Sequence, residues 1–261
     1  MQDQTVIENP FTVLHTDGYG TALSVARGDR KAAGMVFRGD DHDAPNMHAA
    51  LEGLSAGMTA FVEQAAKDAA NVHPTRLSSA LMASAARILP HPFRAVIKAG
   101  VEARQSRAEW LHRREQVHVV APATINALTS TWMAATLGQI AERTKTANAD
   151  ALAVLLTIRD VIEIPPEMWS EIIHRYIATA IIEGKRPGGH EFPKLQSPET
   201  PFATGVDRDA VFKNEGEIFG KYEALGDRLE DIEASISGLV ALIATATEAS
   251  IAETWMMLTG K

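Results

Sequence analysis

Apolar residues recur at helical spacing along most of the chain, and these stripes predict its elements. In the stripe over 45–72 the apolar positions are separated by alternating steps of four and three residues, which places them on one face of an α-helix. That stripe consists of Met47, Leu51, Leu54, Met58, Phe61 and Ala65. Comparable patterns predict an all-α fold with a multi-helix bundle body, whose further helices cover 75–88, 93–116, 123–145, 149–163 and 167–183.

The longest regular pattern lies in a helix expected over 207–258. Its apolar positions keep an unbroken heptad spacing, which is typical of a helix that faces a partner helix in a coiled coil. We therefore expect self-association through this helix, with packing inside the chain as the alternative and 45–72 as the best intramolecular partner. The expected self-association residues are Ile218, Tyr222, Leu225, Leu229, Ile232, Ile236, Leu239 and Ile243.

Four segments that differ in composition and apolar pattern indicate the organisation of the chain. Residues 1–43 read as an irregular N-terminal arm, in which the short apolar stretches around Phe11 and Val36 allow a hairpin. Residues 44–186 form the helical body. Residues 187–206 are rich in Pro and Gly and predict a linker that leads to the C-terminal heptad helix over 207–261. On this linker we expect the apolar side chains to dock on a neighbouring subunit, namely Phe192, Leu195 and Phe202.

Composition supports a helical globular protein and excludes several kinds of chemistry. The 261 residues are 46% hydrophobic and 22% charged, and alanine, the best helix former, is abundant. There is no cysteine, which rules out disulfides, thiol catalysis and cysteine-held metals. The chain also lacks the glycine patterns of phosphate-binding loops and of a serine nucleophile elbow.

The charge is unevenly distributed along the chain. The net charge is -8, and the C-terminal half carries the acidic excess, whereas 76–114 is locally basic. Such a basic stretch is a candidate for nucleic-acid contact, although its cations do not form one stripe on a helical wheel and a solvated or partner-facing surface is the alternative. The candidate nucleic-acid contacts are Arg94, Lys98, Arg104 and Arg107.

Two Glu-x-x-His units resemble the ligand pairs of ferritin-like di-metal bundles. They lie at 109–112 and 171–174, with Glu63 and Glu142 on the helices that precede them. On a helical wheel, however, Glu171 and His174 fall on the polar face of their helix, whereas metal ligands of such bundles point inward. We therefore assign no catalytic, cofactor-binding or metal-ligating residue, and no cofactor.

No window of the sequence is long and apolar enough to cross a bilayer, and the first residues lack the features of a signal peptide. We expect a cytoplasmic protein, or one inside or on an assembled particle. The combined features predict a non-enzymatic structural protein that self-associates, such as a subunit of a virus-like or appendage particle. The alternatives are a nucleic-acid-associated packaging or regulatory oligomer and a ferritin-like di-metal enzyme.

Overall fold

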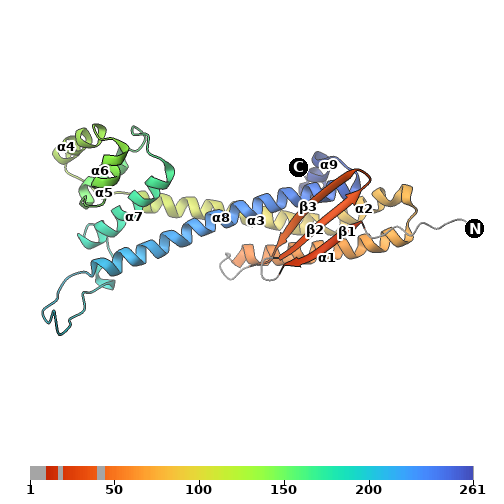
Figure 1. Ribbon diagram of the computed structural model, residues 1–261, viewed down its shortest axis with the longest axis horizontal. Coiled ribbons are helices and arrows are strands. Elements are labelled where there is room, and N and C mark those ends of the chain that lie inside the picture. The colour runs from red at the N-terminus through yellow and green to blue at the C-terminus, as the bar shows by residue number, and fades with distance from the viewer. Residues whose placement is uncertain (1–9, 17–19, 40–44, 261) are drawn as a thin grey trace, which may run out of the picture. The chain divides into compact units, whose positions relative to one another are not determined.

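The computed structural model describes residues 10–16, 20–39 and 45–260, and it divides the chain into two compact units. Unit 1 comprises Met1–Ser106 and Leu225–Lys261, and unit 2 comprises Arg107–Ala224. The boundary falls within two helices, α3 (Pro90–Glu115) and α8 (Arg208–Thr247), so each of these helices contributes a segment to both units. The predicted helical fold with a long C-terminal helix is confirmed, with a small sheet in addition (Figure 1).

Unit 1 begins with a sheet where the sequence analysis expected an irregular arm with a hairpin. The strands β1 (Phe11–Thr16), β2 (Gly20–Arg27) and β3 (Arg30–Phe37) form an antiparallel meander in the order β1-β2-β3. Gly28 adopts a φ of +57° in the two-residue turn between β2 and β3, a conformation that glycine reaches without steric cost. The short apolar stretches are therefore strands of one sheet.

The sheet packs on α8 through a close approach of two glycines. A Cβ atom on Gly34 of β3 would lie 3.2 Å from the carbonyl carbon of Gly238 on α8, so only glycine fits there without displacement of the backbone. Next to this contact the hydroxyl of Ser235 donates a hydrogen bond to the carbonyl oxygen of Met35. Figure 1 shows the strands lying across α8 and α1 (Pro45–Asn71).

The helices of unit 1 surround an apolar interior. All six members of the predicted 45–72 stripe are buried on α1, and they meet Leu81 of α2, Phe93 of α3 and Leu239 of α8 in one core cluster. The stripe prediction for this helix is therefore confirmed. Besides its parts of α3 and α8, unit 1 contains the helices α1 (Pro45–Asn71), α2 (Pro74–Ile88) and α9 (Ile251–Thr259).

Unit 2 is built from shorter helices, most of which begin at a proline or at a side-chain cap. The helix expected over 123–145 is two helices, because Thr136 accepts a hydrogen bond from the Gln139 backbone and starts a new helix with a capping box. The helix expected over 149–163 is buried as α6, but it ends already at Thr157. The helices of unit 2 are α4 (Pro122–Met133), α5 (Leu137–Thr144), α6 (Ala149–Thr157) and α7 (Pro166–Ile182), with a 3-10 turn at Gly189–Glu191.

The Pro/Gly-rich segment 187–206 does not separate two units, because the residues on both sides of it belong to unit 2. It is a loop that closes on itself. Pro193 and Val206 form an isolated antiparallel bridge, and the backbone of Asp207 donates to the carbonyl of Phe192 at 2.8 Å. These bonds return the chain to the start of α8, so the segment joins α7 to α8 inside one unit.

The expected C-terminal helix is interrupted near its end. α8 ends at Thr247, Glu248 adopts a positive φ of 58°, and α9 follows at an angle of 111°. Among the described residues no single helix is long and apolar enough to cross a membrane, and only the bent pair α8 and α9 passes such a test together.

Candidate functional site

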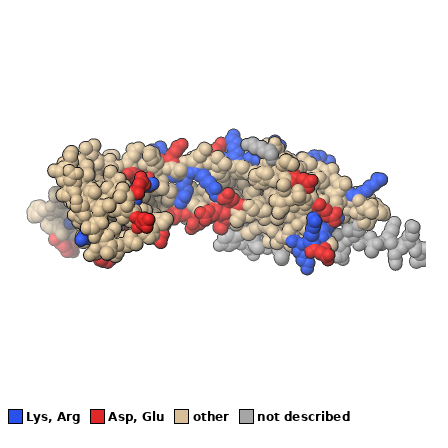
Figure 2. Space-filling model, turned by 90° about the horizontal axis from the view of Figure 1, so that it is seen from above, with Lys and Arg blue, Asp and Glu red and all other residues tan. Residues whose placement is uncertain are grey.

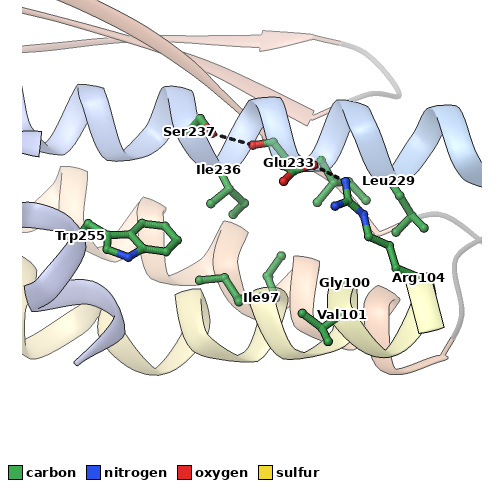
Figure 3. A pocket seen from close by; sticks show the side chains of 11 residues that line it. Ile97, Gly100, Val101, Arg104, Leu229, Glu233, Ile236, Ser237 and Trp255 are labelled. Carbon is green, nitrogen blue, oxygen red and sulfur yellow. Dashed lines mark hydrogen bonds and ion pairs between the residues drawn. The ribbon is translucent and has the colours of Figure 1, made fainter. Parts of the chain in front are cut away.

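A groove of about 200 Å³ opens on the surface of unit 1 between α3, α8 and α9 (Figure 3). Its floor is apolar, because α3 and α8 turn their core stripes toward each other at this point. Trp255 of α9 stands at one end of the groove, and Arg104 of α3 lies toward the other. The apolar lining residues are Val96, Ile97, Val101, Leu229, Ile232, Ile236 and Trp255.

The bend before α9 determines which face of this helix is exposed. Ser250 caps the helix in a capping box with Glu253, and Gly260 ends it in the left-handed conformation. Thr254 and Leu258 then point into unit 1 and are fully buried. The exposed side of α9 carries Trp255 and Met256, and Ile251 in the first turn of the helix is also left in solvent.

Together with α3, this face forms an exposed apolar surface, which we call the α9 patch. It consists of Val101, Ile251, Trp255 and Met256, whose exposed fractions lie between 40 and 63%. Val101 and Trp255 also line the groove, so the patch and the groove are continuous. Large apolar side chains that are exposed together on a surface generally mark an interaction site.

Charged residues border the groove on two sides. Arg104 on α3 forms an ion pair with Glu233 on α8, and both side chains are about half exposed. On α3 the exposed cations Arg94 and Lys98 precede Arg104, while α8 exposes a run of acidic side chains. That acidic run consists of Asp227, Glu230, Asp231 and Glu233.

Most of the predicted self-association residues are used inside the chain. Leu229, Ile232, Ile236, Leu239 and Ile243 are buried in the core of unit 1, where α1, α2 and α3 cover them. The other three, Ile218, Tyr222 and Leu225, are half-buried. The heptad therefore does not present a free seam over 229–243, and the intramolecular alternative describes this stretch.

The four candidate nucleic-acid contacts all have partners in their own unit. The Nε of Arg94 donates to the carbonyl of Pro90, Lys98 pairs with Glu102, and Arg104 pairs with Glu233. In unit 2 the guanidinium of Arg107 lies 4.0 Å from the ring centre of Tyr222 and donates to its carbonyl. On the face shown in Figure 2, cations and anions are interspersed, with wide uncharged areas between them. This mixed pattern differs from the one-signed surface that phosphate binding favours.

The apolar residues of the 187–206 loop divide into two kinds. Phe192, expected to dock on a neighbouring subunit, packs against the core of its own unit 2. The bridge between Pro193 and Val206 and the hydrogen bond from the Asp207 backbone to the Phe192 carbonyl hold this part of the loop beside the start of α8. Leu195 and Phe202 are 78% and 90% exposed and remain free for such a contact.

The two Glu-x-x-His units are not brought together into a metal centre. Glu63 belongs to unit 1 of the fold. Glu142 and the two Glu-x-x-His motifs at 109–112 and 171–174 belong to unit 2. The ring of His174 lies against Phe212 and Phe219, where burial lowers its pKa. Within the described ranges no group of three or more His, Asp or Glu side chains comes close enough to hold a metal ion.

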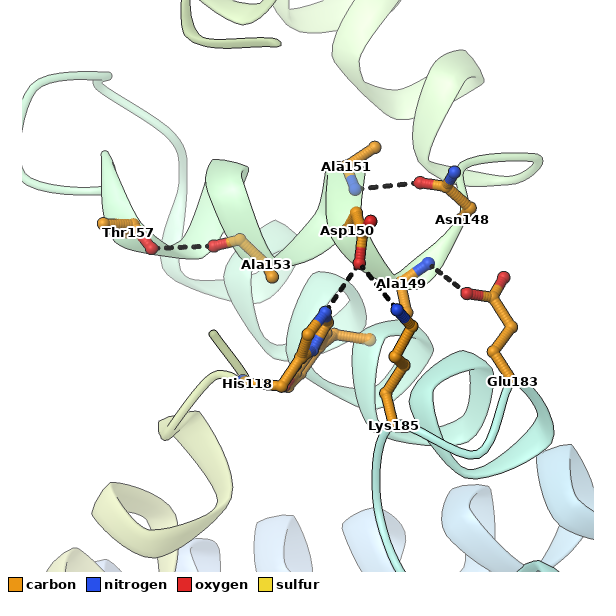
Figure 4. Close-up of polar contacts among 10 residues, drawn as sticks. His118, Asn148, Ala149, Asp150, Ala151, Ala153, Thr157, Glu183 and Lys185 are labelled. Carbon is orange, nitrogen blue, oxygen red and sulfur yellow. Dashed lines mark hydrogen bonds and ion pairs between the residues drawn. The ribbon is translucent and has the colours of Figure 1, made fainter. Parts of the chain in front are cut away.

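A polar cluster that the sequence analysis did not single out ties α6 to α7 (Figure 4). The Nε2 of His118 lies 2.7 Å from Oδ1 of Asp150, and Lys185 approaches the same oxygen at 3.6 Å. The hydrogen bond with His118 lowers the pKa of Asp150, and Lys185 adds to this effect. The hydroxyl of Tyr176 accepts a hydrogen bond from the His118 backbone at 2.9 Å.

The same region is anchored at the start of α6 by two further bonds. Asn148 accepts from the backbone of Ala151, and Glu183 accepts from the backbone of Ala149. The two larger cavities of unit 2 are lined by other residues. The cluster thus caps α6 and fixes residue 118 against α7, which is a structural role.

No protein-family model, curated protein or solved structure matches this chain.

Proposed function

We propose that this protein is a non-enzymatic structural subunit that associates with copies of itself through the α9 patch and the adjoining groove. The observation that carries the proposal is the exposure of Val101, Ile251, Trp255 and Met256 beside an apolar groove. Full burial of one such side chain stabilises the buried state by about 1.5–3 kcal/mol. Because four of them are in contact with water here, a partner that covers them gains part of this free energy.

The capping of α9 supports a surface that is held in place rather than one formed on binding. The capping box at Ser250 and the buried Leu258 fix the orientation of the helix, and thereby that of Trp255. A pre-organised apolar surface loses little conformational entropy when a partner covers it.

The charges around the groove favour a second copy of the chain as the partner. α3 exposes Arg94 and Lys98 on one edge of unit 1, and α8 exposes Glu230 and Asp231 on another. In a two-fold symmetric contact the same surface meets itself, so the basic edge of each copy can face the acidic edge of the other. The α9 patch would lie at the centre of such a contact and the charges at its rim.

The proposed contact through the α9 patch differs from the coiled-coil contact that the heptad predicts. A coiled coil through Leu229 to Ile243 would have to remove these residues from the core of unit 1, whereas contact through α9 leaves that core intact. The proposal therefore keeps self-association as the function and assigns it to the end of the C-terminal segment.

A particle larger than a dimer needs a second contact. Leu195 and Phe202 are the strongest candidates in unit 2, because both are exposed on the loop that closes at Pro193. Replacing both by Ser should then reduce any larger species to the unit formed through the α9 patch.

Light scattering on the purified full chain tests the proposal. The wild type should be an oligomer, and Trp255→Ser combined with Met256→Ser should give monomers with an unchanged circular dichroism spectrum. The matched control is Val161→Ser, which removes a similarly exposed apolar residue from unit 2 and should leave the oligomer intact. A monomeric wild type at about 100 µM would refute the proposal, since specific contacts of ordinary size are formed at that concentration.

A mixing experiment tests whether the partner is a second copy. One variant carries Arg94→Glu and Lys98→Glu, and the other carries Glu230→Lys and Asp231→Lys. Each variant alone should be monomeric because like charges oppose each other, and an equimolar mixture should form a heterodimer. If neither substitution changes the mass, the charge argument is wrong. If the wild type is monomeric but binds duplex DNA or RNA with an affinity that falls steeply with salt, the nucleic-acid alternative holds instead.

A further inference from the structure

Unit 2 contains a cavity of about 390 Å³ in which two arginines meet. It lies between the end of α3, the second half of α7, the segment 186–192 and the first turns of α8. Its volume falls within the range of small-molecule sites in proteins. The polar residues that define its chemistry are Arg114, Arg186, His190, Glu191, Asn214 and Glu215.

Arg114 is held in a mostly apolar setting. Its side chain is only 19% exposed, and its guanidinium lies 4.8 Å from the ring centre of Trp110. It forms an ion pair with Glu215, whose side chain is 6% exposed, while its Nε is buried without a hydrogen-bond partner. Burial lowers the pKa of Arg114 to about 10, and the nearby charge of Arg186 contributes to this shift.

Arg186 brings a second positive charge to the same place. Its two terminal nitrogens donate to the carbonyls of Arg113 and Arg114, which are left unpaired by the end of α3. These hydrogen bonds explain why Arg186 lies next to Arg114: Arg186 caps the C-terminal end of α3. They also fix the position of the charge.

The charges in the cavity are not balanced in its interior. Two guanidinium groups line the cavity, but only one carboxylate of its lining, Glu215, is buried, because Glu191 is exposed, as is His190. A buried Glu215 neutralises only one of the arginines. The remaining positive charge, together with the unpaired Nε of Arg114, suits an anionic group, which guanidinium binds through paired hydrogen bonds.

The rest of the wall is apolar and limits the kind of anion. Ile177 and Ile181 of α7, Phe192 of the loop and Ile218 of α8 line it. Gly188, at a φ of +112°, turns the loop back toward α7, and a Cβ on Gly189 would lie 3.2 Å from the carbonyl oxygen of Ile181. This close approach holds the loop against α7 and so forms the apolar wall of the cavity. An inorganic ion in the cavity would leave this wall in contact with water.

We infer that this cavity binds an organic anion, in which a phosphate or carboxylate group pairs with Arg186 and Arg114 and an apolar body lies against Ile181 and Phe192. The cavity belongs entirely to unit 2. The inference is therefore independent of the association proposed for unit 1.

Isothermal titration on the full chain tests this inference with three probes: phenyl phosphate, benzoate and inorganic phosphate. At least one of the two aromatic anions should bind with a dissociation constant below about 1 mM and at least about tenfold more tightly than inorganic phosphate. A preference for phenyl phosphate or for benzoate decides which anionic group the site takes. Absence of binding by all three probes refutes the inference, and equal binding of inorganic phosphate refutes the role of the apolar wall.

Substitutions of Arg186 separate ligand binding from helix capping. Arg186→Lys keeps the charge, and Arg186→Gln keeps a donor for the end of α3 but removes the charge. The affinity for the probe should fall about tenfold or more in the Gln variant and less in the Lys variant. The matched control is Arg159→Gln, an arginine of unit 2 outside this cavity, which should bind as the wild type does. Equal affinities in the Gln variant and the wild type would show that Arg186 only caps α3.

Discussion

Units 1 and 2 depart from an ordinary globular interior in opposite ways. Unit 1 buries apolar side chains and a few hydroxyls, such as Thr254, which donates to a backbone carbonyl, and it leaves the α9 patch in solvent. Unit 2 also exposes apolar side chains, such as Val119 and Phe202, but among the described residues it differs from unit 1 in burying a carboxylate, Glu215, together with most of Arg114. Exposed apolar surface and buried charge both cost free energy, and a partner relieves each of them. This difference is the basis for proposing a protein contact for unit 1 and an anion site for unit 2.

The largest expected effect is on the apolar interior of unit 1. Leu239→Asp places a carboxylate at a fully buried position beside Gly34. It should destabilise unit 1 by more than about 4 kcal/mol, because the carboxylate would be buried among the apolar side chains of the core cluster. Hydrogen exchange measured by mass spectrometry should show loss of protection in peptides from α1 and the sheet. Unchanged protection there would mean that α8 does not pack as described.

A slightly smaller effect is expected from breaking the buried charge pair of unit 2. Glu215→Gln leaves Arg114 without its counter-ion and should cost about 3–5 kcal/mol. The double variant with Arg114→Met should recover part of this loss, since it removes the unpaired charge. Urea unfolding followed by tryptophan fluorescence provides the measurement. A Glu215→Gln variant as stable as the wild type would show that the pair is not buried in solution.

Two glycines of unit 1 should respond with opposite signs. Gly34→Ala forces the sheet away from Gly238 and should destabilise the chain by about 1–3 kcal/mol. Gly53→Ala on α1 meets no atom within 4 Å and should stabilise by about 0.5–1 kcal/mol, because alanine favours helix. Thermal unfolding of the two variants side by side checks both signs. A neutral Gly34→Ala would argue against the close approach of β3 and α8.

The smallest effect concerns acid stability, and it should be shared by both units. The pKa of Asp150 in unit 2 lies below its ordinary value of 3.8 because of the hydrogen bond with His118, and the pKa of Glu248 in unit 1 lies below 4.5 because of the hydrogen bond with Ser78. A lowered pKa contributes stability that is present above the ordinary value and is lost as the pH falls through the folded-state value.

Asp150→Asn and Glu248→Gln should therefore reduce stability at pH 7 slightly and flatten its decline below about pH 4.5. Both carboxylates are partly exposed, so solvent screening keeps the effect small. The exposed Glu217→Gln is the matched control for removal of one surface carboxylate. An acid limb as steep in both variants as in the wild type would contradict the assignment.

Much of the helical architecture could be predicted because its signal is local. The 45–72 stripe is buried as α1, and the strongly apolar 149–163 segment contains the buried α6. The sheet was underestimated, since strands of this length give a short apolar pattern that a loop can share. The loop 187–206 has the composition of a linker, and only the bridge between Pro193 and Val206 shows that it folds back.

Of the candidate sites, the charged cavity of unit 2 gives no sequence signal. Arg114, Arg186 and Glu215 are far apart along the chain and belong to no motif, so their meeting depends on the packing of α3, the loop and α8. The four arginine and lysine candidates at 94–107 were visible as a basic stretch, but the distant partners Glu233 and Tyr222 were not.

The sequence by itself determined most of the helical segments and which of their faces avoid water, because a 3.6-residue period and proline positions act within one element, whereas the breaks near Thr136 and Glu248 were not predicted. It also determined that the C-terminal helix has one continuous apolar face. The tertiary structure alone decided what covers that face, because burial depends on residues brought together from distant parts of the chain. Thus the apolar residues from Leu229 to Ile243 lie in the protein's own core, and after the bend at Glu248, Trp255 and its neighbours are exposed.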